Sequence, residues 1–186
     1  MWLVLAFVSA ALLGFYDISK KYSLDGNAVI PVLFLNTFFC SLFFLPLILA
    51  SFAGLIPQGA LFYIPECSSH AHLLMFAKAV IVLSSWLLAY FAMKHLPLTI
   101  VGPVNATRPV MTLVGALIVF GESLNLWQWA GVALSVISFF MLGRSGKKEG
   151  IRFAHNRWIY FLVAAALLGA ASALYDKFLM SPVSVG

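Results

Sequence analysis

The sequence predicts an all-α, polytopic membrane protein built as an inverted-repeat helical bundle. Of its 186 residues, 63% are apolar and 9% are charged, and the mean hydropathy is +1.02. A bilayer core is crossed by roughly 20 apolar residues in a helix, and several apolar stretches approach this length. Because apolar and polar residues do not alternate strictly, the stretches are typical of membrane helices rather than of barrel strands.

A motif near the start of the chain returns near its end. Ala11-Leu-Leu-Gly14, followed by Tyr16-Asp17, is echoed by Ala166-Leu-Leu-Gly169, followed by Tyr175-Asp176. Five apolar stretches lie in the first unit, and an odd number of crossings forces the next unit to insert upside down. We therefore expect a complete five-helix repeat at 1–143, a basic linker at 144–157, and the first helix of an incomplete second repeat at 158–186. The bundle is expected to be truncated after six spans.

The six spans are placed by their apolar runs and the turn residues between them. The predicted ranges are 2–22, 28–54, 72–93, 97–120, 126–143 and 158–179. Asp25-Gly26-Asn27 separates the first two spans, and Leu96-Pro97 leaves a tight turn before the fourth. Ala10 with Gly14, and Ala165 with Gly169, have the small-xxx-small spacing that lets helices approach closely, so they are predicted packing positions.

The fourth span carries the least ordinary residues. Pro103 and Pro109 should kink the helix and leave carbonyl groups without partners inside it. Arg108 lies near the middle, where a charge costs about 2.5–3.5 kcal/mol on insertion scales, and it shares one helical face with Asn105 and Thr112. This face is predicted to line a substrate cavity, with Arg108 binding an anionic or zwitterionic group. A structural arginine that bonds the freed carbonyls is the alternative.

Three further polar residues are predicted cavity candidates: Lys21, Asn36 and Ser85. Hydrogen bonds between helices explain Asn36 and Ser85 as readily. Lys20 is interpreted as part of a solvated helix end. For Lys78, inside the third span, extension of the side chain to the headgroup region is favoured over cavity lining.

Other classes of function find little support in the sequence. Glu66, Cys67, His70 and His72 gather potential metal ligands, but one short cluster without a second arm does not enclose an ion, so no metal is predicted. No nucleophile-base pair or phosphate-binding loop is evident, so neither an enzyme nor a cofactor is predicted. The basic residues of 144–157 are interpreted as a topology signal rather than a nucleic-acid site.

The stretch from Asn105 through Arg108-Pro109 and Gly121-Glu122 to Trp127-Gln-Trp129 and Gly131 resembles the fourth and fifth spans of EamA-type members of the drug/metabolite transporter superfamily. The resemblance covers residues 2–143 as one repeat and 158–180 as the start of another. It departs from the family pattern at Leu13 and around Ser138. Gly121 and Glu122 match the Gly-Glu turn of the family. Glu122 is there interpreted as a cap of the following helix, with proton coupling as the alternative.

The resemblance implies ten helices in two inverted repeats around a central cavity. It implies alternating access that moves small organic metabolites, such as amino acids or related compounds, across the cytoplasmic membrane, with export favoured over import and protons as a candidate coupling ion. The missing second repeat, or a second copy of the chain, is expected to be needed, and membrane lipid surrounds the bundle. A non-transporting integral membrane interaction protein, or a remnant of a transporter, is the alternative. Loop charges predict an external amino terminus, whereas the resemblance implies cytoplasmic termini, so the orientation stays open.

Overall fold

The computed structural model describes residues 2–57, 59–60, 62–64, 68–121, 123–148 and 156–180. Its helices are α1 (Trp2–Leu24), α2 (Val29–Phe52), α3 (Ser69–His95), α4 (Leu98–Ala106), α5 (Arg108–Phe120), α6 (Leu126–Lys148) and α7 (Arg157–Leu179). They follow the predicted spans closely, with the fourth span divided into α4 and α5. The all-helical fold class predicted from the apolar pattern is therefore confirmed.

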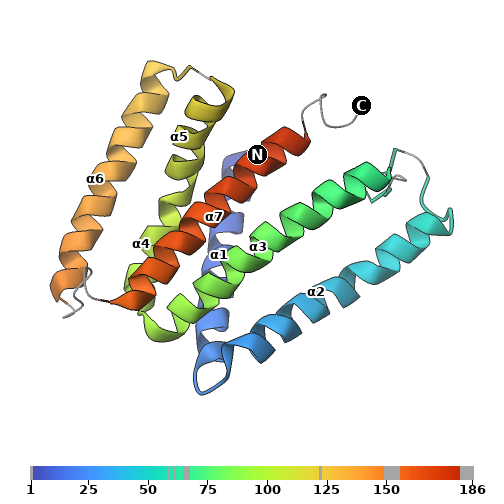
Figure 1. The fold of residues 1–186 in the computed structure, drawn as a ribbon, viewed down its shortest axis with the longest axis horizontal. Helices are drawn as coiled ribbons and strands as arrows, with labels where there is room; N and C mark the ends of the chain where they lie inside the picture. The colour runs from blue at the N-terminus through green and yellow to red at the C-terminus, as the bar shows by residue number, and fades with distance from the viewer. Residues whose placement is uncertain are drawn as a thin grey trace.

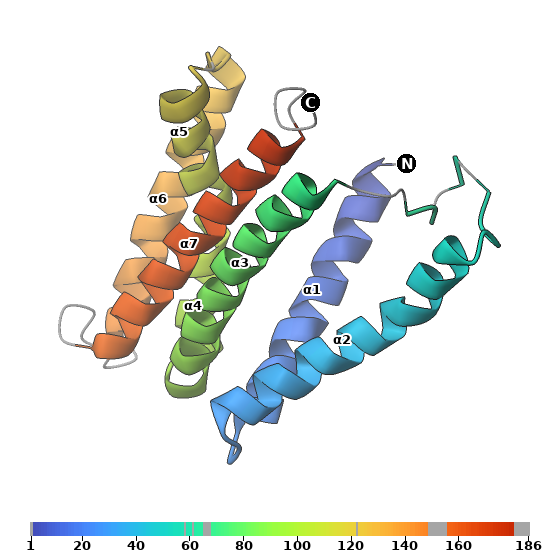
Figure 2. The ribbon, with the colours of Figure 1, turned by 45° about the vertical axis from the view of Figure 1, so that its right-hand side comes forward.

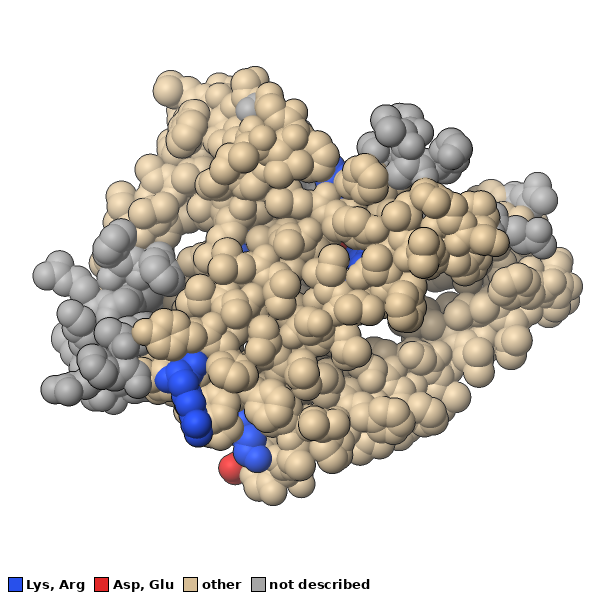
Figure 3. Space-filling view, viewed as in Figure 1, with Lys and Arg blue, Asp and Glu red and all other residues tan. Residues whose placement is uncertain are grey.

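Several of these helices are long and apolar enough to cross a membrane. In the described part of the chain they are α2, α3, the α4–α5 segment Leu98–Phe120, and α7, while Leu126–Ile137 forms a shorter apolar stretch in α6. The space-filling view shows a face that is almost entirely uncharged (Figure 3). Large apolar side chains such as Phe7, Phe43 and Ile118 are more than 70% exposed. Lipid, rather than a protein interior, is the solvent that such a surface suits.

The core forms where α7 packs along α3. Figures 1 and 2 both show these two helices side by side near the middle of the molecule, with α4 and α5 against the other side of α7. Leu162 and Ala166 of α7 belong to one buried cluster with Tyr90 and Met93 of α3, and Ala165 of α7 is also buried. Small residues on α7 allow this close approach.

The two copies of the repeated motif run in opposite directions. In α1, Tyr16 lies beside Tyr90 and Lys21 beside the end of α3, so α1 is parallel to α3. In α7, the ring of Trp158 stacks on His95 and Asp176 pairs with Lys78, so α7 is antiparallel to α3. An odd number of crossings between the copies requires this inversion, which Figure 1 shows from the courses of α1 and α7.

Candidate functional site

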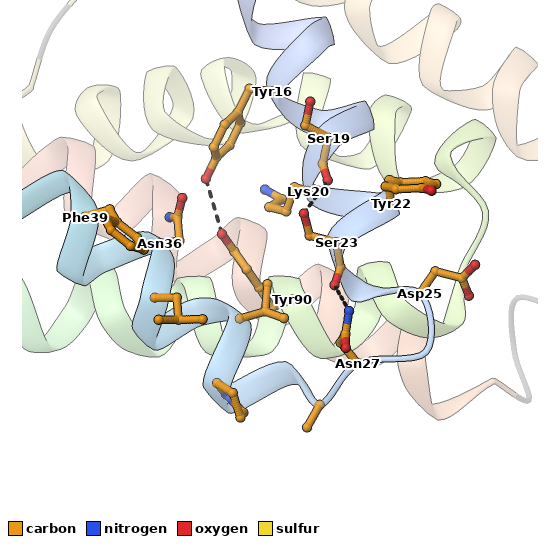
Figure 4. Close-up of a pocket in the computed structure, with 14 residues that line it drawn as sticks. Tyr16, Ser19, Lys20, Tyr22, Ser23, Asp25, Asn27, Asn36, Phe39 and Tyr90 are labelled. Carbon is orange, nitrogen blue, oxygen red and sulfur yellow. Dashed lines mark hydrogen bonds between the residues drawn. The ribbon is translucent and has the colours of Figure 1, made fainter.

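A hollow of about 920 Å³ lies between the carboxyl-terminal half of α1, the amino-terminal half of α2 and Tyr90 of α3 (Figure 4). Its wall combines aromatic rings with hydroxyl, amide and charged groups. The aromatic lining residues are Tyr16, Tyr22, Phe39 and Tyr90, and the polar ones are Ser19, Lys20, Ser23, Asp25, Asn27 and Asn36. A concave site with apolar rings and a few polar groups is typical of small-molecule binding.

Lys20 lies in this wall among two aromatic rings and a carboxylate. Its ammonium nitrogen lies 3.4 Å from Oδ1 of Asp17, 4.7 Å from the centre of the Tyr16 ring and 5.0 Å from that of Tyr90. The two tyrosine hydroxyl oxygens are 3.4 Å apart, and Figure 4 shows Lys20 beside both rings. The Lys20 side chain is 13% exposed. The interpretation of Lys20 as part of a solvated helix end is therefore wrong, because rings and a carboxylate surround its charge.

Asn36 lines the same hollow and is half-buried on α2. Its amide can both donate and accept hydrogen bonds, so it suits a ligand that carries either kind of group. Of the residues predicted as cavity candidates, Asn36 is the one that lies with Lys20 in the wall of the larger hollow. Its role in substrate binding stays a prediction.

Lys21, the next residue after Lys20, points to a different part of the molecule. Its ammonium group donates hydrogen bonds to the backbone carbonyls of Met93, Lys94 and Leu96, at 2.6, 3.3 and 2.9 Å. The last carbonyls of a helix have no partners within it, and a cation there also meets the negative end of the helix dipole. In this structure Lys21 joins α1 to the end of α3 and does not line the larger hollow.

Ser85 likewise connects two helices. It is buried on α3, and its hydroxyl group donates a hydrogen bond of 2.8 Å to the backbone carbonyl of Ala165 on α7. The sequence offered an interhelical hydrogen bond as the alternative to cavity lining for Ser85. The structure has this hydrogen bond, and the hydroxyl group lies in the α3–α7 interface.

Arg108 begins α5 and packs against α7. A Cβ built on Gly169 would lie 3.2 Å from Cζ of Arg108, so the guanidinium group covers this glycine. The buried Nε of Arg108 and the buried Oδ1 of Asn105 lack hydrogen-bond partners in the described structure. Asp17 is the carboxylate that interacts electrostatically with Arg108. Arg108 therefore packs on α7 and does not line the larger hollow.

Thr112 lies one turn after Arg108 on the face that the sequence predicts to be polar. Its hydroxyl group donates a hydrogen bond of 3.0 Å to the carbonyl of Arg108, within α5. Thr112 does not line the larger hollow. Its predicted contact with substrate stays a prediction.

Two prolines flank the interruption of the fourth span. Pro103 lies inside α4 and Pro109 in the first turn of α5, with Thr107 between the two helices. Thr107 donates from its hydroxyl group to the carbonyl of Val104 at 2.7 Å, which satisfies an acceptor near the end of α4. The break places Arg108 at a helix start rather than in a continuous helix.

The turn after α5 is closed by a glycine. Gly121 has φ 63°, the left-handed conformation that glycine adopts without steric cost. Glu122, predicted to cap the following helix, lies outside the described residues. Two residues that the sequence analysis did not single out cap α6: Asn125 accepts from the amide of Leu126 at 2.6 Å, and Gln128 accepts from the amide of Asn125 at 2.8 Å. Their spacing is that of a capping box and was available as a signal.

Lys78 on α3 forms an ion pair with Asp176 on α7. A carboxylate of the neighbouring helix thus neutralises the ammonium group, and the extension of Lys78 to the headgroup region stays a prediction. Lys78 also borders a second, mainly apolar hollow of about 490 Å³ that includes Thr37, Met75 and Trp86. An unpaired charge is costly in a membrane, and this pair reduces that cost where α3 and α7 meet.

Among the described residues, no three His, Cys, Asp or Glu side chains are grouped to hold a metal ion. Of the short histidine cluster, Glu66 and Cys67 lie outside the described residues. His72 contacts the carbonyl of Ser68 through Nδ1 at 2.9 Å, within the first turn of α3.

Comparisons with known proteins agree with this architecture. The family model of the EamA-like transporter family matches residues 1–144. A protein from Archaeoglobus fulgidus described as an uncharacterized transporter is 23% identical over 186 residues, which cover 98% of this chain and 62% of that relative. The chain thus spans less than two thirds of the length of the relative. No solved structure gives a significant match. The chain belongs to the EamA-like transporter family.

Proposed function

We propose that this chain moves small organic metabolites across the cytoplasmic membrane by alternating access, and that export is its physiological direction. Its family is one of membrane transporters rather than enzymes. The observation that supports a solute pathway in this chain is the larger hollow, where Lys20, Asn36 and the rings of Tyr16 and Tyr90 face one space. Amino acids or related compounds are the proposed substrate class.

The hollow supports this proposal because its walls come from three helices of one repeat. Helices α1 and α2 meet at the Asp25–Asn27 turn, which borders the hollow, while Asn36 and Tyr90 line it farther along their helices. A change in the angle between α2 and the rest of the bundle would alter access to these side chains. Alternating access requires such rigid movement of one group of helices against another.

Flux measured in proteoliposomes tests the proposed function. A panel of radiolabelled amino acids loaded into the vesicles should leave faster than from protein-free vesicles, and an imposed pH gradient should change the rate if protons are coupled. The Asn36→Leu substitution should reduce the flux by removing an amide from the hollow. Thr37→Val, its neighbour on α2 outside the larger hollow, is the matched control.

Flux equal to that of protein-free vesicles for the whole panel would contradict the proposal and favour the non-transporting membrane protein. We also propose that transport needs a second five-helix unit, from further chain or from a second copy. The length of the Archaeoglobus relative supports this part. Cross-linking in the native membrane, before solubilisation, would show whether a second unit is present.

A further inference from the structure

We propose that Lys20 recognises an anionic group of the substrate and that Asp17 is its resident counter-ion, which the substrate anion replaces. This inference rests on the proposed function, because it names the chemistry of the same hollow. Its starting point is the different exposure of the two partners to the hollow: Lys20 lines it and Asp17 does not. The carboxylate of Asp17 therefore holds the ammonium group from behind, and a ligand meets this group from the front.

Two aromatic rings hold the ammonium group of Lys20 in position, so it can stay there when a ligand anion replaces Asp17 as its counter-ion. The rings of Tyr16 and Tyr90 lie 4.7 and 5.0 Å from the ammonium nitrogen, and the negative faces of aromatic rings attract cations by about 0.5–2 kcal/mol. Both rings belong to the wall of the hollow. They fix the lysine side chain beside the space where a ligand would enter.

The Asp17–Lys20 pair is weak enough to be exchanged. Its nitrogen-oxygen distance is 3.4 Å, its two residues lie three positions apart on one helix, and the Asp17 side chain is 28% exposed. Pairs of this kind contribute about 0.2–1 kcal/mol. A ligand carboxylate that also gains hydrogen bonds from Asn36 or a tyrosine hydroxyl group would therefore compete with Asp17 effectively.

Asp17 is also attracted by a second cation, the guanidinium group of Arg108. The buried Nε of Arg108 has no hydrogen-bond partner among the described residues. When a substrate anion takes Lys20, the carboxylate of Asp17 remains near a positive charge rather than alone in an apolar region. Lys20 and Arg108 thus share the one carboxylate of Asp17, which leaves Lys20 available to an anionic ligand. Asp25, the acidic residue in the wall, is exposed at the turn between α1 and α2.

Binding of three matched probes tests this inference independently of transport. Phenylacetate, phenylacetamide and phenethylamine share one ring and differ in charge. Their affinities for the whole chain in nanodiscs would be measured by calorimetry at pH 7.4. We expect phenylacetate to bind most tightly, Lys20→Gln to remove its advantage over phenylacetamide, and Lys20→Arg to retain it. Asp17→Asn should raise the affinity for phenylacetate roughly two- to fivefold, the factor that corresponds to a pair of about 0.4–1 kcal/mol.

Asp176→Asn is the control, because it removes a carboxylate that pairs with another lysine, Lys78, and that does not line the larger hollow; it should leave the preference for phenylacetate unchanged. The inference is overturned if Lys20→Gln weakens all three probes equally, or if Asp17→Asn lowers the affinity for phenylacetate, which would make Asp17 a positioning residue. Selective binding of phenylacetate without flux would overturn the proposed function instead. Saturable flux of uncharged or cationic solutes, without selective binding of phenylacetate, would overturn the inference and leave transport intact.

Discussion

Helices α1 and α7 carry the same small-residue motif in opposite environments. Gly169 of α7 is covered by Arg108, whereas a Cβ added to Gly14 of α1 would meet nothing within 4 Å. Ala165 and Ala166 are fully buried, and their counterparts Ala10 and Ala11 are exposed. The motif thus gives a helix the ability to pack closely, but the neighbouring helices decide whether that ability is used.

The polar residues that follow the motif glycine make different contacts in α1 and in α7. Asp17, three residues after Gly14, pairs with Lys20 next to the larger hollow. The equivalent position in α7 is Ser172, which is buried. Seven residues after each glycine, Lys21 bonds to the carboxyl-terminal end of α3 and Asp176 pairs with Lys78 in its amino-terminal half. In this structure α1 supplies the chemistry of the candidate site, whereas α7 supplies the packing that holds α3 and α5.

The largest effect that separates the two helices is expected for leucine at the two motif glycines. Gly169→Leu should destabilise the bundle by about 3 kcal/mol, because the added side chain has to displace the guanidinium group of Arg108 from a packed interface. Gly14→Leu should change the stability by less than about 0.5 kcal/mol. Titration with dodecyl sulfate in mixed micelles, followed by circular dichroism, measures both. Equal effects would show that α1 is covered as closely as α7.

A smaller loss is expected for Lys21→Gln, at about 1.5 kcal/mol. The ammonium group donates to three carbonyls at the end of α3, and hydrogen bonds to charged groups contribute about 1.5–3 kcal/mol. We take the low end because Lys21 is partly exposed. Lys20→Gln is the matched control for stability, since its ammonium group bonds a carboxylate on its own helix. Equal losses for the two variants would contradict the assignment of Lys21 to helix capping.

Asp176→Asn should lower the free energy of unfolding by about 1 kcal/mol. This loss is smaller than that expected for Lys21→Gln, the variant at the equivalent position of α1. Lys78 and Asp176 are 31% and 42% exposed, so solvent and headgroups screen part of the lost attraction. The double variant with Lys78→Gln should recover most of the loss, because no charge is then left unpaired. A double-mutant cycle in the same micelles measures the coupling between the two residues. A coupling energy near zero would show that the ion pair does not hold α7 on α3.

The helices could be predicted from the sequence because each one is determined by residues that are neighbours along the chain. Apolar length located the spans, and turn residues such as Gly121 marked their ends. The inversion of the second copy followed from counting crossings. The division of the fourth span at Thr107 agrees with the position of Pro103 and Pro109 around it.

The partners of the polar side chains were much harder to predict, because they come from helices far apart in the chain. Lys20 and Lys21 are adjacent in sequence, but one faces a hollow and the other a helix end, since successive residues of a helix point about 100° apart. The sequence offered no distance between Lys78 and Asp176, which are 98 positions apart. Lys20 was assigned to solvent for the same reason: the ring of Tyr90 that encloses it belongs to another helix.

The smallest expected difference concerns the hydrogen bonds that α1 and α7 make to side chains in the carboxyl-terminal half of α3. Ser85→Ala should cost about 0.6–1 kcal/mol, because it removes a buried hydrogen bond of 2.8 Å to the carbonyl of Ala165. Tyr16→Phe removes a bond of 3.4 Å beside an open hollow, where water can replace the lost hydroxyl group, so its effect should be smaller than about 0.5 kcal/mol. Thermal unfolding in detergent, with both variants in parallel, compares the two contacts. If Tyr16→Phe is the more damaging change, α1 contributes more to stability than its exposure indicates, and the division of roles between the two helices fails.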